Sequence, residues 1–113
     1  MDFDTSAELF KALSDAGRLK VLRLLAHPPV NCCASPGSVC ACDLEEHLGL
    51  AQPTVSHHMR LLVQAGLVTA TKRGKWTDYT LNPQGFEKAT ELLQALQASH
   101  LPPSTATTKG ASL

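Results

Sequence analysis

Two short helices joined by a tight turn within residues 43–65 most constrain what this chain can fold into. The first helix is predicted from about residue 43 to 48, and Gly49 ends it, as glycine often does just after a helix. Gln52-Pro53 starts the second helix, because proline is tolerated in a first helical turn, and Ala65-Gly66 ends it. One face of the second helix is apolar and is expected to be buried: Val55, Met59, Leu62 and Leu61.

The segments around this pair complete the pattern of a winged helix. Apolar residues recur at helical spacing over residues 6–14, where Ser6 or Thr5 is expected as the N-cap, and over residues 15–26. After the pair come two β-type runs, at residues 67–71 and 76–81, which are joined by a turn at residues 72–75. A last helix starts at Asn82-Pro83. The expected fold is mainly α with a β-hairpin wing, in the order α-α-α-α-β-β-α.

A chain of 113 residues has room for one domain. We expect this domain to cover residues 1–100, and we expect residues 101–113, mostly Pro, Ser, Thr, Gly and Ala, to form a disordered C-terminal tail. No apolar run approaches the ~20 residues that span a bilayer, and the acidic N-terminus does not resemble a signal peptide. The expected location is therefore the cytoplasm, where crowded cysteines indicate a metal or redox site more than a disulfide framework.

Basic residues collect in the second helix of the pair and in the hairpin turn, although the formal net charge of the chain is zero. In a winged helix the second helix of the helix-turn-helix lies in the major groove, with its N-terminal residues at the base edges. The hairpin can then contact the phosphate backbone. We therefore expect the chain to bind double-stranded DNA through eight residues: Gln52, Thr54, Ser56, His57, Arg60, Lys72, Arg73 and Lys75.

Four cysteines lie between positions 32 and 42, in a stretch that is otherwise rich in loop-forming residues. We expect residues 28–41 to be a loop, and either Cys42 or Asp43 to cap the following helix. At a helix entrance Cys40 is still outside the helical turn, so its sulfur can converge with that of Cys42 on one ion. Thiolates suit soft ions such as trivalent arsenic or antimony, cadmium, lead and zinc. The candidate ligands are Cys40, Cys42, Cys32 and Cys33.

Three segments together resemble the ArsR/SmtB family of metal-responsive winged-helix repressors: ELFKALSDAGRLKVLRLL, VCACDLEEHLGLAQPTVSHHMRLLVQAGLV and KRGKWTDYTL. The resemblance covers about residues 7–97, and the Cys-x-Cys-Asp-Leu sequence at 40–44 matches the arsenic- and antimony-responsive branch. It implies a homodimer that binds operator DNA, blocks transcription and is released by trivalent arsenic or antimony, with no organic cofactor. The resemblance also implies a dimer interface on the first and last helices, through Phe10, Leu13, Leu92 and Leu96.

The sequence departs from this branch at Glu45, where a third cysteine usually stands one turn into the helix. The missing ligand would have to come from Cys32 or Cys33. A second departure, Asp15-Ala16-Gly17-Arg18 in place of the Asp-Pro-Thr-Arg of many relatives, is interpreted as a change in helix capping. Two other functions stay open: a cadmium, lead or zinc sensor that uses four thiolates, and a thiol redox regulator. An enzyme is not expected, because the chain has no Cys-x-x-Cys in a βαβ pattern.

Overall fold

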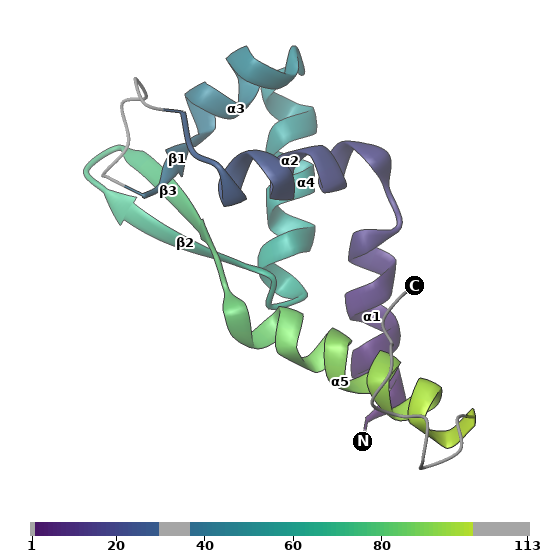
Figure 1. Cartoon of the computed structure of the whole chain (residues 1–113). Coiled ribbons are helices and arrows are strands. Elements are labelled where there is room, and N and C mark those ends of the chain that lie inside the picture. The colour runs from purple at the N-terminus through teal and green to yellow at the C-terminus, as the bar shows by residue number, and fades with distance from the viewer. Residues whose placement is uncertain (1, 30–36, 101–113) are drawn as a thin grey trace.

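The structure of the chain is a computed structural model that describes residues 2–29 and 37–100. Within these residues the chain forms α-helices and a three-stranded antiparallel sheet (Figure 1). In chain order the elements are α1 (Phe3–Leu13), α2 (Ala16–Ala26), β1 (Val39–Cys40), α3 (Ala41–Leu48), α4 (Gln52–Gln64), β2 (Val68–Arg73), β3 (Trp76–Leu81) and α5 (Pro83–His100). None of the described helices is long and apolar enough to cross a membrane.

The predicted winged-helix order is confirmed, with one addition at β1. α3 and α4 form the helix-turn-helix, β2 and β3 form the wing, and α5 follows. β1 lies in the segment 28–41 that is predicted to be a loop, so that prediction is wrong for Val39 and Cys40, and also for Ala41, which begins α3. Val39 and Cys40 are extended because they pair with β3, far along the chain. Local sequence patterns do not reveal a contact of this kind.

The start of α1 also differs from the prediction. The helix begins at Phe3 because the side chain of Asp2 accepts hydrogen bonds from the backbone N–H groups of Asp4 and Thr5. The predicted caps, Ser6 and Thr5, are therefore wrong, and both residues lie inside the helix.

The start of α3 matters more, because it belongs to the thiol site. Cys40 is the N-cap, so the predicted caps Cys42 and Asp43 are wrong and lie within the first helical turn. Asp43 occupies the third helical position, and its carboxylate accepts a hydrogen bond from the backbone N–H of Cys40 at 3.4 Å. At the other end Gly49 takes the left-handed conformation expected of it, with φ 66°.

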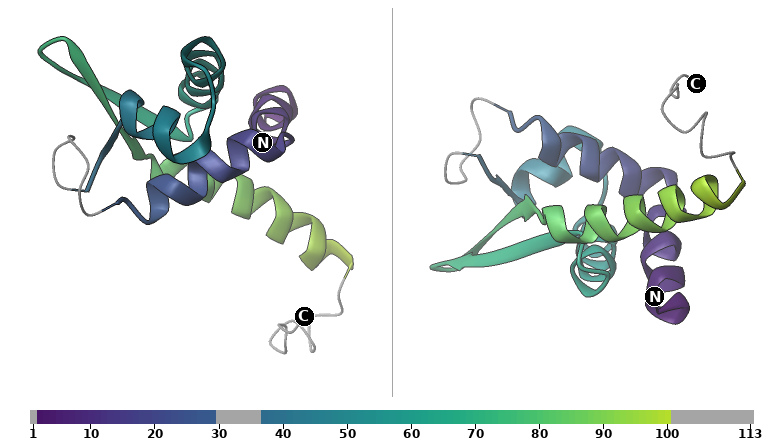
Figure 2. Two further views of the ribbon diagram at one scale, coloured as in Figure 1. Left: turned by 90° about the horizontal axis from the view of Figure 1, so that it is seen from above. Right: turned by 60° about the horizontal axis from the view of Figure 1, so that its bottom comes forward.

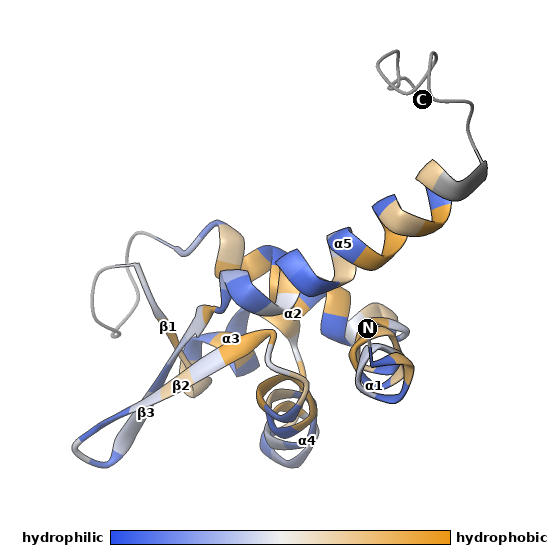
Figure 3. Ribbon diagram, turned by 90° about the horizontal axis from the view of Figure 1, so that it is seen from below, coloured by the Kyte–Doolittle hydropathy of each residue, from blue (hydrophilic) through white to orange (hydrophobic). Residues whose placement is uncertain are grey.

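The hydrophobic core lies where α2, α4 and the base of the sheet meet. Val21 of α2, Leu44 of α3 and Leu62 of α4 have no exposed surface. The apolar face predicted for α4 is confirmed, since Val55 and Met59 are also buried. Figure 3 shows that the wing tip is hydrophilic and that apolar and polar residues alternate along α5. The core therefore fixes the inner face of α4 and leaves the wing tip in solvent.

The sheet has the strand order β1-β3-β2, so β3 is the central strand. Its pairing with β2 runs from Val68↔Leu81 near the helices to Arg73↔Trp76 at the tip. On its other edge β3 pairs with Val39 and Cys40. Figure 2 shows that the long β2–β3 hairpin projects away from the helices, whereas β1 pairs with the middle of β3. The wing is thus attached to the segment that leads directly into α3.

Three predictions fall outside the described residues: the disordered tail at 101–113, and the candidate ligands Cys32 and Cys33. The domain boundary at residue 100 likewise stays a prediction.

Candidate DNA-binding surface and thiol site

α4 presents its predicted DNA-binding residues to solvent. Burial of Val55, Met59 and Leu62 anchors the opposite face of the helix in the core. All five α4 residues that are predicted to contact DNA are exposed: Gln52, Thr54, Ser56, His57 and Arg60. A polar helix face of this kind can offer hydrogen-bonding groups to base edges in the major groove.

Arg60 determines which nitrogen of a neutral His57 carries the proton. Its Nη2 lies 2.9 Å from Nδ1 of His57. Because an arginine guanidinium can only donate, this Nδ1 accepts, and the proton of the neutral ring is on Nε2. His57 therefore carries a donor that suits an acceptor such as guanine N7 or O6.

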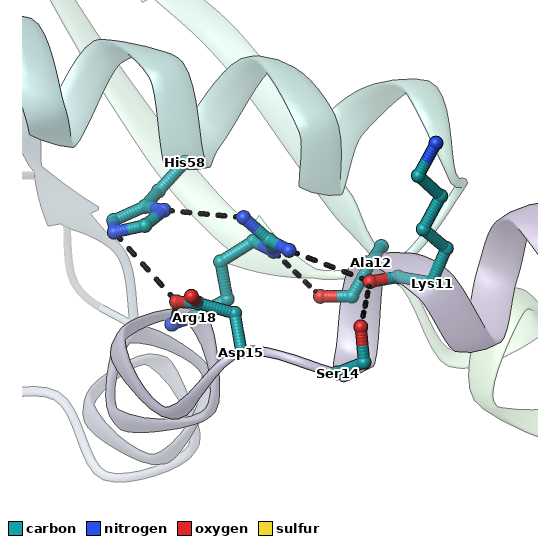
Figure 4. A network of polar contacts seen from close by, with 6 residues as sticks. All are labelled: Lys11, Ala12, Ser14, Asp15, Arg18 and His58. Carbon is teal, nitrogen blue, oxygen red and sulfur yellow. Dashed lines mark hydrogen bonds and ion pairs between the residues drawn. The ribbon is translucent and has the colours of Figure 1, made fainter.

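His58 belongs to a polar network that joins three helices (Figure 4). Its Nε2 is 3.9 Å from a carboxylate oxygen of Asp15, and its Nδ1 is 3.5 Å from Nη1 of Arg18. Arg18 also donates from Nε to the carbonyl oxygen of Ala12 at 2.7 Å. The network therefore ties the end of α1 and the start of α2 to α4.

Asp15 is the N-cap of α2, despite the departure at the next two positions. It accepts a hydrogen bond from the backbone N–H of Arg18 at 3.0 Å, and this bond holds the pKa of Asp15 below its usual value. The positive charge of Arg18 acts in the same direction. A Cβ at Gly17 would lie 2.9 Å from Nε2 of His58. Glycine at this position thus serves the packing of α2 against α4, and the cap itself is conventional.

The wing carries the other three predicted DNA contacts. Lys72 and Lys75 are exposed near its tip, whereas Arg73 is only partly exposed. Arg73 donates from Nε and Nη2 to the two carboxylate oxygens of Asp78, at 2.8 and 3.1 Å, and the side chain of Asp78 is 5% exposed. The lysines can reach phosphate, while the arginine is engaged within the sheet. The sequence does not reveal this pairing, since Asp78 looks like an isolated acid in a strand.

The sulfurs of Cys40 and Cys42 meet at the start of α3. Cys40 is extended, with φ −90° and ψ 165°, and Cys42 lies in the first helical turn. Their Sγ atoms are joined as a disulfide, with the Cα atoms 5.5 Å apart. Cys40 is fully buried and Cys42 is half-buried.

Asp43 adds a carboxylate to the two sulfurs, a donor that the Cys-x-Cys spacing does not single out. It is buried, and its Oδ2 lies 3.1 Å from Sγ of Cys40. One ligand atom from each of Cys40, Cys42 and Asp43 lies within 4.8 Å of the other two. Two sulfurs and an oxygen at this spacing fit a soft or borderline metal ion. Glu45, which stands where the branch has its third cysteine, is not part of this group.

The predicted dimer residues lie on α1 and α5, which pack against each other. Three of the four are buried or half-buried within the chain itself: Phe10, Leu13 and Leu92. The fourth, Leu96, is 61% exposed. Two apolar residues outside the predicted set, Phe3 on α1 and Leu93 on α5, are 69% and 56% exposed. Helical spacing groups apolar residues on one face, but it does not separate those that the chain's own core covers from those left in solvent.

Comparison with known sequences identifies the family. The model described as "Bacterial regulatory protein, arsR family" matches residues 15–70. The arsenical resistance operon repressor of Staphylococcus xylosus is 38% identical over 99 residues, which cover 88% of this chain and 86% of that protein. The chain belongs to the ArsR family. As an ArsR-family protein it is a DNA-binding transcriptional repressor and not an enzyme.

Solved ArsR-family structures share its architecture. The crystal structure of an ArsR family transcriptional regulator matches with a TM-score of 0.71 over 88% of this chain and 92% of that chain, at 21% identity. At this identity the likeness establishes the fold alone. The homodimeric winged helix-turn-helix DNA-binding domain of a possible ArsR-family regulator from Mycobacterium bovis, solved by NMR, matches with a TM-score of 0.63 and 26% identity, over 88% of this chain and 84% of that chain.

Proposed function

We propose that this ArsR-family repressor is a homodimer that binds operator DNA in its ligand-free form and releases it when trivalent arsenic or antimony binds cysteine thiolates. Relatives named for arsenical resistance support the choice of ligand, and the homodimeric Mycobacterium bovis domain supports the assembly. The observation that carries the proposal is the meeting of the Cys40 and Cys42 sulfurs at the start of α3.

In the DNA-bound state, α4 lies in the major groove and its exposed residues meet the base edges. Lys72 and Lys75 of the wing contact phosphates, which adds affinity without sequence preference. In a symmetric dimer two copies of α4 face half-sites about one helical turn apart, or a multiple of it. The expected operator is therefore an inverted repeat.

The inducer needs a third donor beside Cys40 and Cys42. Trivalent arsenic and antimony take three sulfurs, so we assign this role to Cys32 or Cys33. Chain length does not limit their approach, because the seven steps from Cys33 to Cys40 reach at most about 23 Å. If the oxygen of Asp43 were the third donor instead, the mixed set would suit zinc or cadmium better than arsenic. The identity of the third donor therefore determines which ion the protein senses.

Release depends on how close the thiol site lies to α4. α3 is capped by Cys40 at its start and by Gly49 at its end, and α4 begins three residues later at Gln52. A ligand that draws the start of α3 toward the preceding segment shifts α3, and with it α4, out of register with the groove. The ligand must bind the released conformation more tightly than the DNA-competent one, and such couplings are typically about 5–150-fold.

Fluorescence anisotropy with a DNA duplex that the reduced protein selects from a random pool tests the proposal. Arsenite should weaken binding by about 5–150-fold. Arsenate, which does not bond directly to thiolates, should leave it unchanged. Cys40→Ser and Cys42→Ser should each bind the duplex and lose the response to arsenite. A normal response in both variants would exclude the two residues as ligands.

The double variant Cys32→Ser with Cys33→Ser tests the third ligand. Loss of the arsenite response, with DNA binding retained, would assign that ligand to this pair. If the response survives, Asp43 is the next candidate, because its carboxylate is already beside both sulfurs. Ultraviolet absorption on titration counts the thiolates per ion, and so separates a three-sulfur arsenic site from a four-thiolate cadmium, lead or zinc site.

The disulfide between Cys40 and Cys42 favours a second candidate, a thiol redox regulator. In this case oxidation of the two thiols by an added disulfide or diamide closes the bond, and a dithiol reductant reopens it. Oxidant alone should then release DNA, and dithiothreitol should restore binding. If the oxidised protein binds DNA as tightly as the reduced protein, the redox function is excluded.

A further inference from the structure

Cys40 is attached to the DNA-binding wing as well as to α3. It lies directly opposite Asp78 in the pairing of β1 with β3, and Val39 lies opposite Tyr79. Side chains of directly opposed residues in an antiparallel pair point to the same face of the sheet. The thiol of Cys40 and the carboxylate of Asp78 therefore share one face of a sheet whose outer part is the wing.

Asp78 is in turn bonded to a residue near the tip of the wing. Its carboxylate is held by Arg73 through two hydrogen bonds, although Thr71 is the β2 residue directly opposite. Arg73 is in turn opposite Trp76, the chain's single tryptophan. Because residues two apart on a strand share a face, four side chains lie on one face of the sheet, in two neighbouring pairs: Cys40 with Asp78, and Arg73 with Trp76.

The two attachments of β3 differ greatly in extent. β1 contributes two residues to the sheet, whereas β2 and β3 pair over six positions. Asp78 is 4% exposed, and its ion pair with Arg73 compensates the charge of this buried carboxylate. A change at Cys40 can thus disturb the short β1–β3 pairing while the hairpin stays intact. The buried carboxylate then transfers the disturbance to Arg73, with which it forms an ion pair.

We infer that the Arg73–Asp78 ion pair is a positioning element that couples Cys40 to the wing. The inference rests on the proposed function, and adds the wing to α4 as an element that responds to the inducer. Rearrangement of Cys40 on ligand binding displaces Asp78, and this loosens Arg73. The adjoining Lys72 and Lys75 then leave their position on the phosphate backbone. Arg73 acts through the sheet and not as a phosphate contact of its own.

Asp78→Asn tests the coupling, because it keeps the shape of the side chain and removes its charge. Glu87→Gln is the matched control, since it removes one negative charge from an exposed position on α5. Without arsenite, Asp78→Asn should bind DNA more weakly than the control. The factor by which arsenite weakens binding, about 5–150-fold in the wild type, should fall toward one in Asp78→Asn and stay unchanged in Glu87→Gln.

Trp76 supplies a readout that needs no DNA. It is 45% exposed and shares the face of Asp78 and Arg73, so its emission should change when arsenite binds to the reduced wild type. Asp78→Asn should still bind arsenite, as the thiolate absorption reports, and should lose the change in emission. A residue that only stabilised the fold would alter DNA affinity with and without arsenite alike, and would leave the coupling factor unchanged.

Arg73→Lys provides an independent test if Asp78→Asn does not fold. Lysine keeps the positive charge for a phosphate but loses the two-donor geometry that holds the carboxylate. A reduced coupling factor supports the positioning role, and a normal factor overturns it. If arsenite has no effect on the wild type, the proposed function fails. In that case Trp76 emission is measured for the wild type and the same variants in two states, with the Cys40–Cys42 disulfide closed by diamide and with it reduced. An equal change in emission between the two states in all of these proteins overturns the link to the wing.

Discussion

Cys40 combines three structural roles in one residue. It is the N-cap of α3, it pairs with Asp78 at the edge of the sheet, and its sulfur meets that of Cys42. The residue has no exposed surface, so an ion cannot reach its sulfur without displacing neighbouring atoms. Those neighbours also fix the start of a helix and the edge of a sheet. Under the proposed function, ligand binding at this residue would therefore be linked to structural change.

Asp15 is expected to make the fold sensitive to acid. The hydrogen bond from the Arg18 backbone N–H lowers its pKa in the folded chain below the usual 3.8. Because the folded pKa lies below that of the unfolded chain, the stabilisation is complete above the unfolded pKa and is lost as the pH falls through the folded value. Thermal unfolding of the wild type and of Asp15→Asn, from about pH 6 to about pH 3, measures this loss.

Asparagine is the matched replacement, because it is also a good N-cap but does not titrate. The melting temperature of the wild type should fall more steeply than that of Asp15→Asn once the pH drops below about 4. The pKa of Asp2 is also lowered, chiefly by the hydrogen bond from the Thr5 hydroxyl, but this contribution is present in both proteins. Parallel melting profiles would contradict the role assigned to Asp15.

At the residue scale the sequence predicts contacts within one turn better than contacts across the fold. Helix geometry predicts that the sulfurs of Cys40 and Cys42 can converge, and in the structure the two sulfurs meet, whereas their binding of one ion stays a prediction. The approach of Asp43 to these sulfurs depends on which residue caps α3, and neither predicted cap was correct. The pairing of Arg73 with Asp78 requires knowledge of the strand register, which is set by the whole hairpin.

At the scale of elements, too, the sequence predicts what depends on local pattern better than what depends on contacts across the fold. The apolar face of α4 was predictable because a helix repeats every 3.6 residues, and its sequence shows that period. β1 was not predictable, because two residues are too few to show an alternating pattern. They form a strand only because they pair with β3. The element missing from the prediction is thus the one that connects the thiol site to the wing.

α5 joins the winged helix through a close backbone contact at Gly85. A Cβ at this position would overlap the carbonyl group of Gly66, which follows α4. Replacing glycine by alanine within a helix normally gains about 0.5–1 kcal/mol. Overpacking against an atom that cannot rotate away costs about 1–3 kcal/mol, so the overlap should prevail. Gly85→Ala should therefore lower the unfolding free energy by about 1–2 kcal/mol in a urea titration.

Gln84→Ala is the control, because Gln84 is exposed in the same helical turn. It should change the unfolding free energy by no more than about 0.5 kcal/mol. If Gly85→Ala proves as stable as the wild type, α5 can move away from Gly66 at little cost. In that case the orientation of α5 relative to α4 is not fixed by this contact.

At the scale of the whole molecule, the chain leaves apolar surface uncovered on the side of α1 and α5. Figure 1 shows α5 extending past α1, away from the helix-turn-helix. Among the residues whose burial the structure describes, the large apolar side chains exposed by more than half are Phe3, Leu93 and Leu96. A domain of this size buries a smaller fraction of its surface by itself than a larger domain does. A second copy of the chain that covers these residues would add to its stability and would place two copies of α4 on one operator.

Leu93→Glu together with Leu96→Glu tests this assembly. Both side chains are largely exposed in the single chain, so the change should leave its helical content intact. Burial of two unpaired carboxylates in a dimer interface would cost free energy and so disfavour the dimer. Light scattering should therefore report a monomer for the double variant and a dimer for the wild type. Operator affinity should fall because each monomer reaches one half-site. Leu19→Glu on α2, where the leucine is 50% exposed, is the control and should stay dimeric. A double variant that keeps the mass of a dimer would place the interface elsewhere.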